Sequence, residues 1–129
     1  MKENKKIKLK KITNIIENSD SNIISVKEII DITKMNPRKI KEMIFLLNSQ
    51  NRISQINDSL IIDNNSFNNL LSSVREHFLN CKTLSISDFK NISRLTRKNA
   101  IPILEYFDSR KFTKREGSKR AAGETLFVK

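Results

Sequence analysis

The chain has 129 residues, of which 25 are lysine or arginine and 14 are aspartate or glutamate, so its formal net charge is +11. This excess favours anionic partners, above all nucleic acid. One cysteine excludes an intramolecular disulfide, two glycines leave no glycine-rich phosphate loop, and no apolar run approaches the roughly 20 residues of a membrane span. We therefore expect a cytoplasmic protein that neither hydrolyses nucleotides nor crosses a membrane.

The first half of the chain shows three helical patterns followed by two β-prone runs. Apolar residues at spacings of three and four predict one buried face on each helix. Asn36 is the expected N-cap of the third helix. Asn57 and Asp58 form the expected turn between strands at 52–56 and 60–62. The apolar helix positions are Leu9, Ile12 and Ile16, then Val26, Ile29 and Ile32, then Ile40, Met43, Ile44 and Leu47.

The second half repeats this pattern at an offset of about sixty residues. Thr96 takes the place of the N-cap of the third helix. Strands are expected at 112–115 and 125–128, with a turn at Glu116 and Gly117. The matching apolar helix positions are Leu71, Val74 and Phe78, then Ile86, Phe89 and Ile92, then Ala100, Ile103, Leu104 and Phe107.

Each half therefore has the order helix, helix, helix, strand, turn, strand. This order describes a helix-turn-helix followed by a β-hairpin wing. We predict a mostly α fold with small β wings, consisting of two tandem winged-helix domains at residues 1–64 and 65–129. An all-α bundle with disordered ends is the alternative.

Residues able to carry catalysis or bind a metal are few. His77 and Cys81 are four residues apart on a predicted helix, but two ligands without a third or fourth nearby predict no zinc site. No set of serine, histidine and aspartate suggests a nucleophile. Asp88 and Glu105 are expected to offset neighbouring cations on the helix surface. The sequence predicts no enzyme, no cofactor and no metal.

Positive charge is concentrated between Arg94 and Arg120, where nine basic residues stand against three acidic ones. Arg97 and Lys98 lie in the first turn of a helix, where backbone N–H groups and the helix dipole also favour an anion. In a winged helix this helix and the wing share one face, and Gly117 permits the positive φ of a tight wing turn. The expected nucleic-acid contacts are Arg94, Arg97, Lys98, Asn99, Lys114, Arg115, Gly117, Ser118, Lys119 and Arg120.

The third helices of the two halves differ. Pro102 falls inside the second of them, where proline removes one backbone hydrogen bond at a cost of about 3 kcal/mol, so it indicates a specific local geometry. The first carries Arg38, Lys39 and Lys41, a weaker basic set. We expect the first domain to be a spacer or a secondary contact surface.

In the second half of the chain, the residues of the third helix and the wing resemble a known family. The runs TRKNAIPILEYFD at 96–108 and FTKREGSKR at 112–120 closely resemble the last winged helix of the bacterial selenocysteine-specific elongation factor, SelB. The resemblance implies a module that grips the selenocysteine insertion hairpin of messenger RNA, while GTPase domains outside these residues carry selenocysteinyl-tRNA to a UGA codon. The residues that it places against RNA are Arg97, Lys98, Arg115, Gly117 and Arg120.

The implied partners are an mRNA stem-loop, the ribosome and the GTPase domains of the factor, and we expect a monomer. Asn99 departs from the family pattern, in which an aromatic residue often stands at that position. The residue types alone do not separate RNA from duplex DNA. A DNA-binding transcriptional regulator and a protein-interaction module are therefore the alternative functions.

Overall fold

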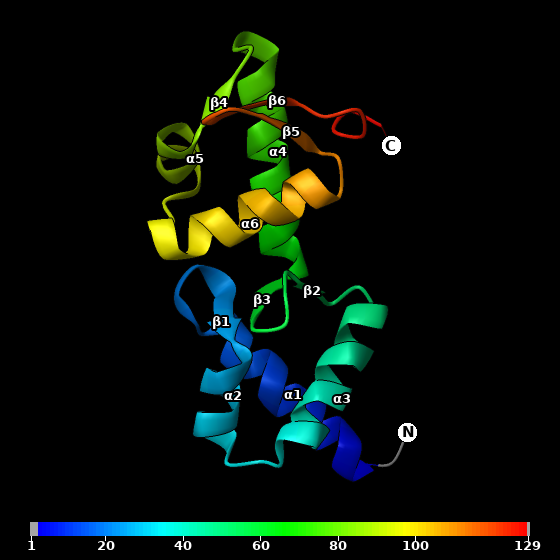
Figure 1. Cartoon of the computed structure of the whole chain (residues 1–129). Helices are drawn as coiled ribbons and strands as arrows, with labels where there is room; N and C mark the ends of the chain where they lie inside the picture. Colours follow the sequence, from blue (N-terminus) through cyan, green and yellow to red (C-terminus); the bar gives the residue numbers. More distant parts are fainter. Residues whose placement is uncertain (1–2, 129) are drawn as a thin grey trace. The chain divides into compact units, whose positions relative to one another are not determined.

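The computed structural model describes residues 3–128, and the chain divides into two compact units, residues 1–67 and 68–129 (Figure 1). Each unit contains helices and one three-stranded antiparallel sheet. Helix is thus the main component and the strands are short, as the sequence predicts. No helix among residues 3–128 is long and apolar enough to cross a membrane.

Unit 1 begins with a long helix and ends with a β-hairpin. Its sheet has the order β1-β3-β2, so that the last strand lies between the other two. The elements are α1 (Glu3–Glu17), the 3-10 turn η1 (Asp20–Asn22), β1 (Ile23–Ser25), α2 (Val26–Thr33), α3 (Pro37–Ser49), β2 (Ile53–Gln55) and β3 (Leu60–Asp63).

Local signals explain where the unit 1 helices begin and end. The Ser25 hydroxyl accepts a hydrogen bond from the Glu28 amide and caps α2, which ends where Lys34 adopts a left-handed conformation. The Asn36 side chain accepts from the Arg38 amide, so the predicted N-cap of α3 is confirmed. Asn57 organises the hairpin turn by accepting from the amides of Ser59 and Leu60.

The core of unit 1 consists almost entirely of isoleucine and leucine. The predicted faces of α1 and α3 are buried: Leu9, Ile12 and Ile16 are at most 4% exposed, as are Ile40, Met43, Ile44 and Leu47. Ile32 does not follow its helix, because it is 58% exposed at the end of α2. Its assignment to the buried face was wrong: Ile32 is the last residue but one of the eight-residue α2, in which only Val26 and Ile29 are buried.

Unit 2 repeats this order of elements. Its sheet has the order β4-β6-β5, again with the last strand in the middle. The elements are α4 (Asn64–Asn80), whose first residues lie in unit 1, β4 (Leu84–Ser85), α5 (Ile86–Ser93), α6 (Arg97–Ser109), β5 (Thr113–Glu116) and β6 (Lys119–Ala122).

Two strand predictions need correction. The short strands β1 and β4 were not predicted, because three or two residues before a helix give no alternating pattern. The second wing strand was placed at 125–128, but it is β6 at Lys119–Ala122. The sequence KRAA has little β propensity and becomes a strand because β4 and β5 pair with it on both sides.

The tail after β6 folds back onto the unit instead of forming a strand. Leu126 is fully buried, and its carbonyl oxygen accepts a 2.6 Å hydrogen bond from Arg75 Nε of α4. Thr125 donates to the Arg110 carbonyl at the end of α6. Of the apolar residues that suggested a strand, only Leu126 closes the core, whereas Phe127 and Val128 are exposed.

Aromatic rings fill the centre of unit 2. Phe89 and Phe107 pack edge to face with ring centroids 5.9 Å apart, and Phe112 meets Phe107 in the same way at 6.0 Å. The predicted face of α6 is confirmed, since Ala100, Ile103, Leu104 and Phe107 are all fully buried. This packing joins α6 to α5, and Lys98 and Glu105 on the opposite side of α6 are exposed.

Candidate nucleic-acid interface

The turn between α5 and α6 is fixed by local hydrogen bonds. The Ser93 hydroxyl donates to the Phe89 carbonyl and accepts from the Leu95 amide, and Leu95 is buried. Between them Arg94 adopts a left-handed conformation with φ 62° and is exposed. The turn thus presents Arg94 to solvent just before α6.

The beginning of α6 carries exposed cations and an incomplete cap. Arg97 and Lys98 occupy the first two positions and are exposed, whereas Asn99 is half-buried. Thr96 stands at the predicted N-cap position, but its side chain makes no capping hydrogen bond. In α3, by contrast, Asn36 satisfies one of the first amides. The start of α6 therefore offers backbone N–H groups together with two cations.

Pro102 lies inside α6, as predicted, and the helix continues through it to Ser109. A proline at this position cannot donate to the carbonyl of Lys98, four residues earlier. That carbonyl therefore lacks its usual helical partner in the first turns of α6.

The wing is the hairpin of β5 and β6, with Gly117 and Ser118 in its turn. Gly117 has φ 65°, as predicted for a tight turn, and Arg115 Nε donates to its carbonyl at 3.3 Å. Because residues directly opposite in a ladder share a face, Arg115 shares one face with Arg120, and Glu116 shares the other with Lys119. Lys114, Arg115, Gly117, Ser118 and Lys119 are all exposed.

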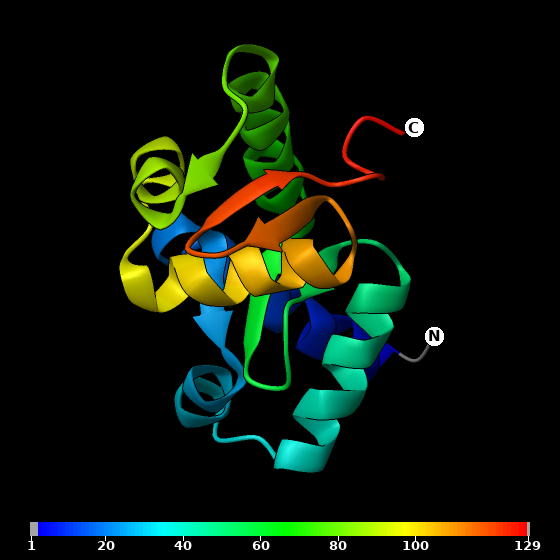
Figure 2. The ribbon, with the colours of Figure 1, turned by 45° about the horizontal axis from the view of Figure 1, so that its top comes forward.

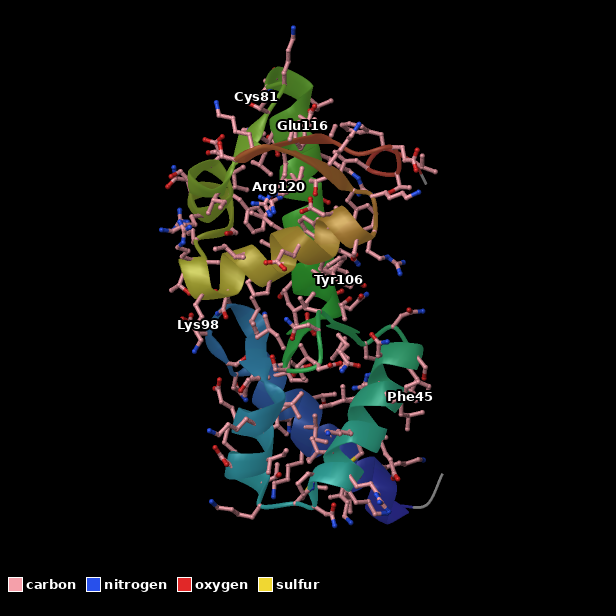
Figure 3. The ribbon with its side chains drawn as sticks, viewed as in Figure 1. Phe45, Cys81, Lys98, Tyr106, Glu116 and Arg120 are labelled. Carbon is pink, nitrogen blue, oxygen red and sulfur yellow. The ribbon has the colours of Figure 1, made fainter. Side chains whose placement is uncertain are left out.

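Arg120 was predicted to face nucleic acid, and the structure contradicts this. It is 3% exposed and its guanidinium bonds Asp108 of α6, with Nη2 3.0 Å from Oδ2 and Nε 3.2 Å from each carboxylate oxygen. Thr113 donates to the same carboxylate at 2.6 Å. Figure 3 shows Arg120 between the hairpin and α6. This arginine fastens the wing to the helix and is not available to a ligand.

The fold brings the beginning of α6 and the wing turn to one side of unit 2. β5 begins just after the end of α6, runs back along the helix and is in contact with it. In Figures 1 and 2 the turn of the hairpin lies on the same side of the unit as the first residues of α6. We define the wing-helix surface as the exposed residues Arg94, Arg97, Lys98, Lys114, Arg115, Gly117, Ser118 and Lys119.

Asp88 has a more specific role than charge neutralisation. The Ser85 hydroxyl accepts from the Asp88 amide, and the Asp88 carboxylate accepts from the Ser85 amide, so the two residues form a capping box at the start of α5. The backbone hydrogen bond from Ser85 is the main reason why the pKa of Asp88 lies below its usual value, with His77 and Lys119 contributing favourable charge. Asp88 therefore stabilises α5.

A hollow of about 590 Å³ lies beside the wing, lined by cations and acids together. Lys111, which the predicted set left out, forms a 3.1 Å ion pair there with Glu124. Lys111 belongs to the basic stretch Arg94–Arg120, and the residue types alone do not distinguish it from the cations predicted as contacts. His77 lies elsewhere, with its ring Nε2 2.7 Å from the Thr83 carbonyl oxygen. Among the described residues no group of three potential metal ligands occurs.

Unit 2 is a winged-helix domain, because its helix-turn-helix is followed by a β-hairpin and a third strand completes the sheet. Residues 76–121 match the family model described as "Elongation factor SelB, winged helix". This segment contains α5, α6 and the whole wing-helix surface. The predicted resemblance to the C-terminal winged-helix region of SelB is therefore confirmed.

Known proteins extend the similarity beyond this segment. The selenocysteine-specific elongation factor of Desulfomicrobium baculatum is 27% identical over 96 residues, which are 74% of this chain and 15% of that protein. The chain thus spans a small part of the relative's length. The E. coli SelB mRNA-binding domain, solved in complex with SECIS RNA, matches with TM-score 0.76 and 22% identity over 90% of this chain and 97% of that one.

A bacterial selenocysteine-specific elongation factor, EF-Sec, also matches in its crystal structure. Its TM-score is 0.71 at 29% identity, covering 90% of this chain and 18% of that chain. Both structural matches extend over most of the two units, so the fold of unit 1 is shared with these proteins as well.

Proposed function

We propose that this chain is the mRNA-binding module of a selenocysteine-specific elongation factor and that its wing-helix surface grips an mRNA hairpin during UGA recoding. The observation that carries this proposal is the set of exposed cations at the start of α6 and on the wing, within the segment that matches the SelB model. The similar E. coli domain was solved in complex with SECIS RNA, which supports the choice of ligand.

Each residue class on this surface has a distinct task in the proposal. Arg97 and Lys98 attract a phosphate that also accepts from the first amides of α6, which the Thr96 side chain leaves uncapped. Lys114, Arg115 and Lys119 of the wing contact the RNA backbone on the other side of the loop of the RNA hairpin. Ser118 of this surface, together with the half-buried Asn99 that follows Lys98 in α6, supplies hydrogen bonds to loop bases in this proposal.

Both units are winged-helix domains in this proposal, with the first at residues 1–64 and the second at 65–129. The first serves as a spacer or secondary contact surface, and the second holds the hairpin. Nucleotide hydrolysis and delivery to the ribosome belong to other parts of such a factor. The module itself catalyses no reaction, and acts as a monomer in the cytoplasm.

Fluorescence anisotropy with three labelled ligands tests the proposal: the selenocysteine insertion hairpin, the same hairpin with a scrambled loop, and duplex DNA of equal length. We expect the native hairpin to bind tightest. Equal affinity for all three would reduce the interface to non-specific charge attraction, and tighter binding of a duplex would favour a DNA-binding regulator.

Alanine variants locate the contacts. Arg97→Ala and Arg115→Ala should each lower the slope of log affinity against log salt by about 0.7 to 0.9 for each lost phosphate contact. Arg110→Ala is the matched control, because it removes the same charge from an exposed arginine at the opposite end of α6. An equal loss in all three variants would contradict the assignment of the wing-helix surface.

A further inference from the structure

Phe45 is an aromatic side chain that the fold of unit 1 does not use. It lies in α3 and is 72% exposed (Figure 3). The same helix packs on the core through Ile40, Ile44 and Leu47, which are at most 1% exposed. Because Phe45 stands on the opposite side of the helix from these residues, its ring stabilises no packing inside the unit.

Two cations share the exposed face of α3 with this ring. Lys41 and Arg38 precede Phe45 by four and seven residues, so they lie along the same side of the helix, and both are exposed. Together with Glu42 these residues line a shallow hollow of about 520 Å³. An aromatic surface is thus open to solvent with positive charge directly beside it.

The composition of this face identifies the kind of ligand. A protein that docks on a helix usually needs apolar anchors at successive turns, whereas here one ring is surrounded by Arg38, Lys41, Glu42 and Ser49. A nucleobase needs only one ring for stacking and one or two cations for the neighbouring phosphates. The base must be unpaired, because the faces of bases inside a duplex are already stacked.

We propose that the exposed face of α3 binds a single-stranded segment of RNA, with one unpaired base stacked on Phe45 and the adjoining phosphates on Arg38 and Lys41. This gives unit 1 a contact of its own, separate from the wing-helix surface of unit 2. The α3 contact is not selective for base sequence, because every base has a face that can stack.

A tryptophan at position 45 measures the stacking directly. The chain contains no tryptophan, so Phe45→Trp in the full chain introduces one fluorescent reporter at the proposed contact. A short single-stranded oligouridylate should quench it, and the same strand annealed into a duplex should quench it much less. Phe127→Trp is the matched control, since Phe127 is 53% exposed in unit 2. No quenching at position 45, or equal quenching at both positions, overturns the proposal.

Affinity variants supply a second measurement. Phe45→Ala should weaken binding of the oligouridylate about tenfold, since stacking on an aromatic side chain contributes this much or more. Ile32→Ala, which removes another exposed apolar side chain of unit 1, should leave the affinity unchanged. Unchanged affinity of Phe45→Ala for the oligouridylate overturns the proposal. This holds also if α3 is found to bind a protein instead.

The two RNA contacts fail separately in these assays. A hairpin without single-stranded extensions should bind Phe45→Ala as it binds the unmodified chain. Conversely, Arg97→Ala should weaken binding of the RNA hairpin. In a chain that also carries Phe45→Trp, it should leave the quenching by oligouridylate intact. Loss of hairpin selectivity would thus count against the proposed function alone, and loss of quenching against the α3 contact alone.

Discussion

The guanidinium of Arg120 and the carboxylate of Asp108 meet through three hydrogen bonds of 3.0 to 3.2 Å, with the arginine side chain 4% exposed. The pair joins the middle strand of the unit 2 sheet to the end of α6. A buried charge requires such a partner, because an unpaired ion in the interior is costly. The positions of wing and helix on the wing-helix surface therefore depend on this pair.

Arg120→Ala should lower the free energy of unfolding of unit 2 by about 3 to 5 kcal/mol, because it leaves the Asp108 carboxylate without its counterion. Lys119→Ala, at the exposed neighbouring position, should change it by less than about 0.5 kcal/mol. Urea unfolding followed by the fluorescence of Tyr106, the single tyrosine of the chain, reports on unit 2. Equal unfolding midpoints for the two variants would mean that the pair contributes nothing to stability.

The two glycines should respond differently to alanine. In Gly117→Ala the new methyl group meets no atom within 4 Å, so the cost is that of a left-handed conformation, about 1 to 2 kcal/mol. In Gly123→Ala the methyl group would collide with the backbone carbonyl of Lys111. Gly123→Ala should thus be the more destabilising variant in the same urea measurement, and the reverse order would contradict the assignment of the close contact.

Removal of the two N-cap side chains should have unequal effects. Asn36→Ala loses the hydrogen bond to the Arg38 amide and should cost about 1 kcal/mol. Thr96→Ala loses no capping hydrogen bond and should cost markedly less. Thermal unfolding by circular dichroism compares the two variants. A larger loss in Thr96→Ala would show that the α6 cap does form in solution, and that a phosphate would have to displace it.

Arg94→Gly separates stability from binding. Because Arg94 has φ 62°, glycine at this position should stabilise the protein by about 1 kcal/mol. The same substitution should weaken hairpin binding by removing a cation of the wing-helix surface. Lys34→Gly, at φ 58° in unit 1, should give similar stabilisation with hairpin affinity retained. A drop in hairpin affinity as large in Lys34→Gly would assign the effect to net charge alone.

Asp88 should make unit 2 less stable in acid. Its pKa in the folded state lies below the ordinary value of 3.8, so the ionised carboxylate contributes stability above that pH, and the contribution disappears as the pH falls through the folded pKa. The difference in unfolding free energy between the unmodified chain and Asp88→Asn should therefore be constant near neutral pH and shrink once the pH falls below 3.8. A difference that does not change with pH would mean that the stabilisation by Asp88 does not depend on the ionisation of its carboxyl group.

Periodicity was sufficient to predict the helices but not the complete sheets. The buried face of α6 follows directly from Ala100, Ile103, Leu104 and Phe107, because a helix determines its own side-chain spacing. A strand as short as β6 owes its existence to the partners beside it. The sequence alone therefore placed the second wing strand in the tail, where apolar residues are more frequent.

The predicted site had a similar limit. Counting charges identified the exposed cations of α6 and the wing, since most charged residues remain in solvent. It could not separate Arg120 from Lys119, because burial of Arg120 depends on a carboxylate twelve residues earlier in the chain. Neither could it notice Phe45, which helical periodicity marks only as a residue outside the buried face.

The order β4-β6-β5 leaves β5 as an open edge of the unit 2 sheet. Unpaired backbone groups on such an edge can recruit a strand from another molecule and so start aggregation. Three of the four residues of β5 are charged and exposed: Lys114, Arg115 and Glu116. The cations proposed to hold RNA should thus also hinder pairing between β5 strands of neighbouring copies, and neutralising them should lower the solubility of the chain as well as its affinity for RNA.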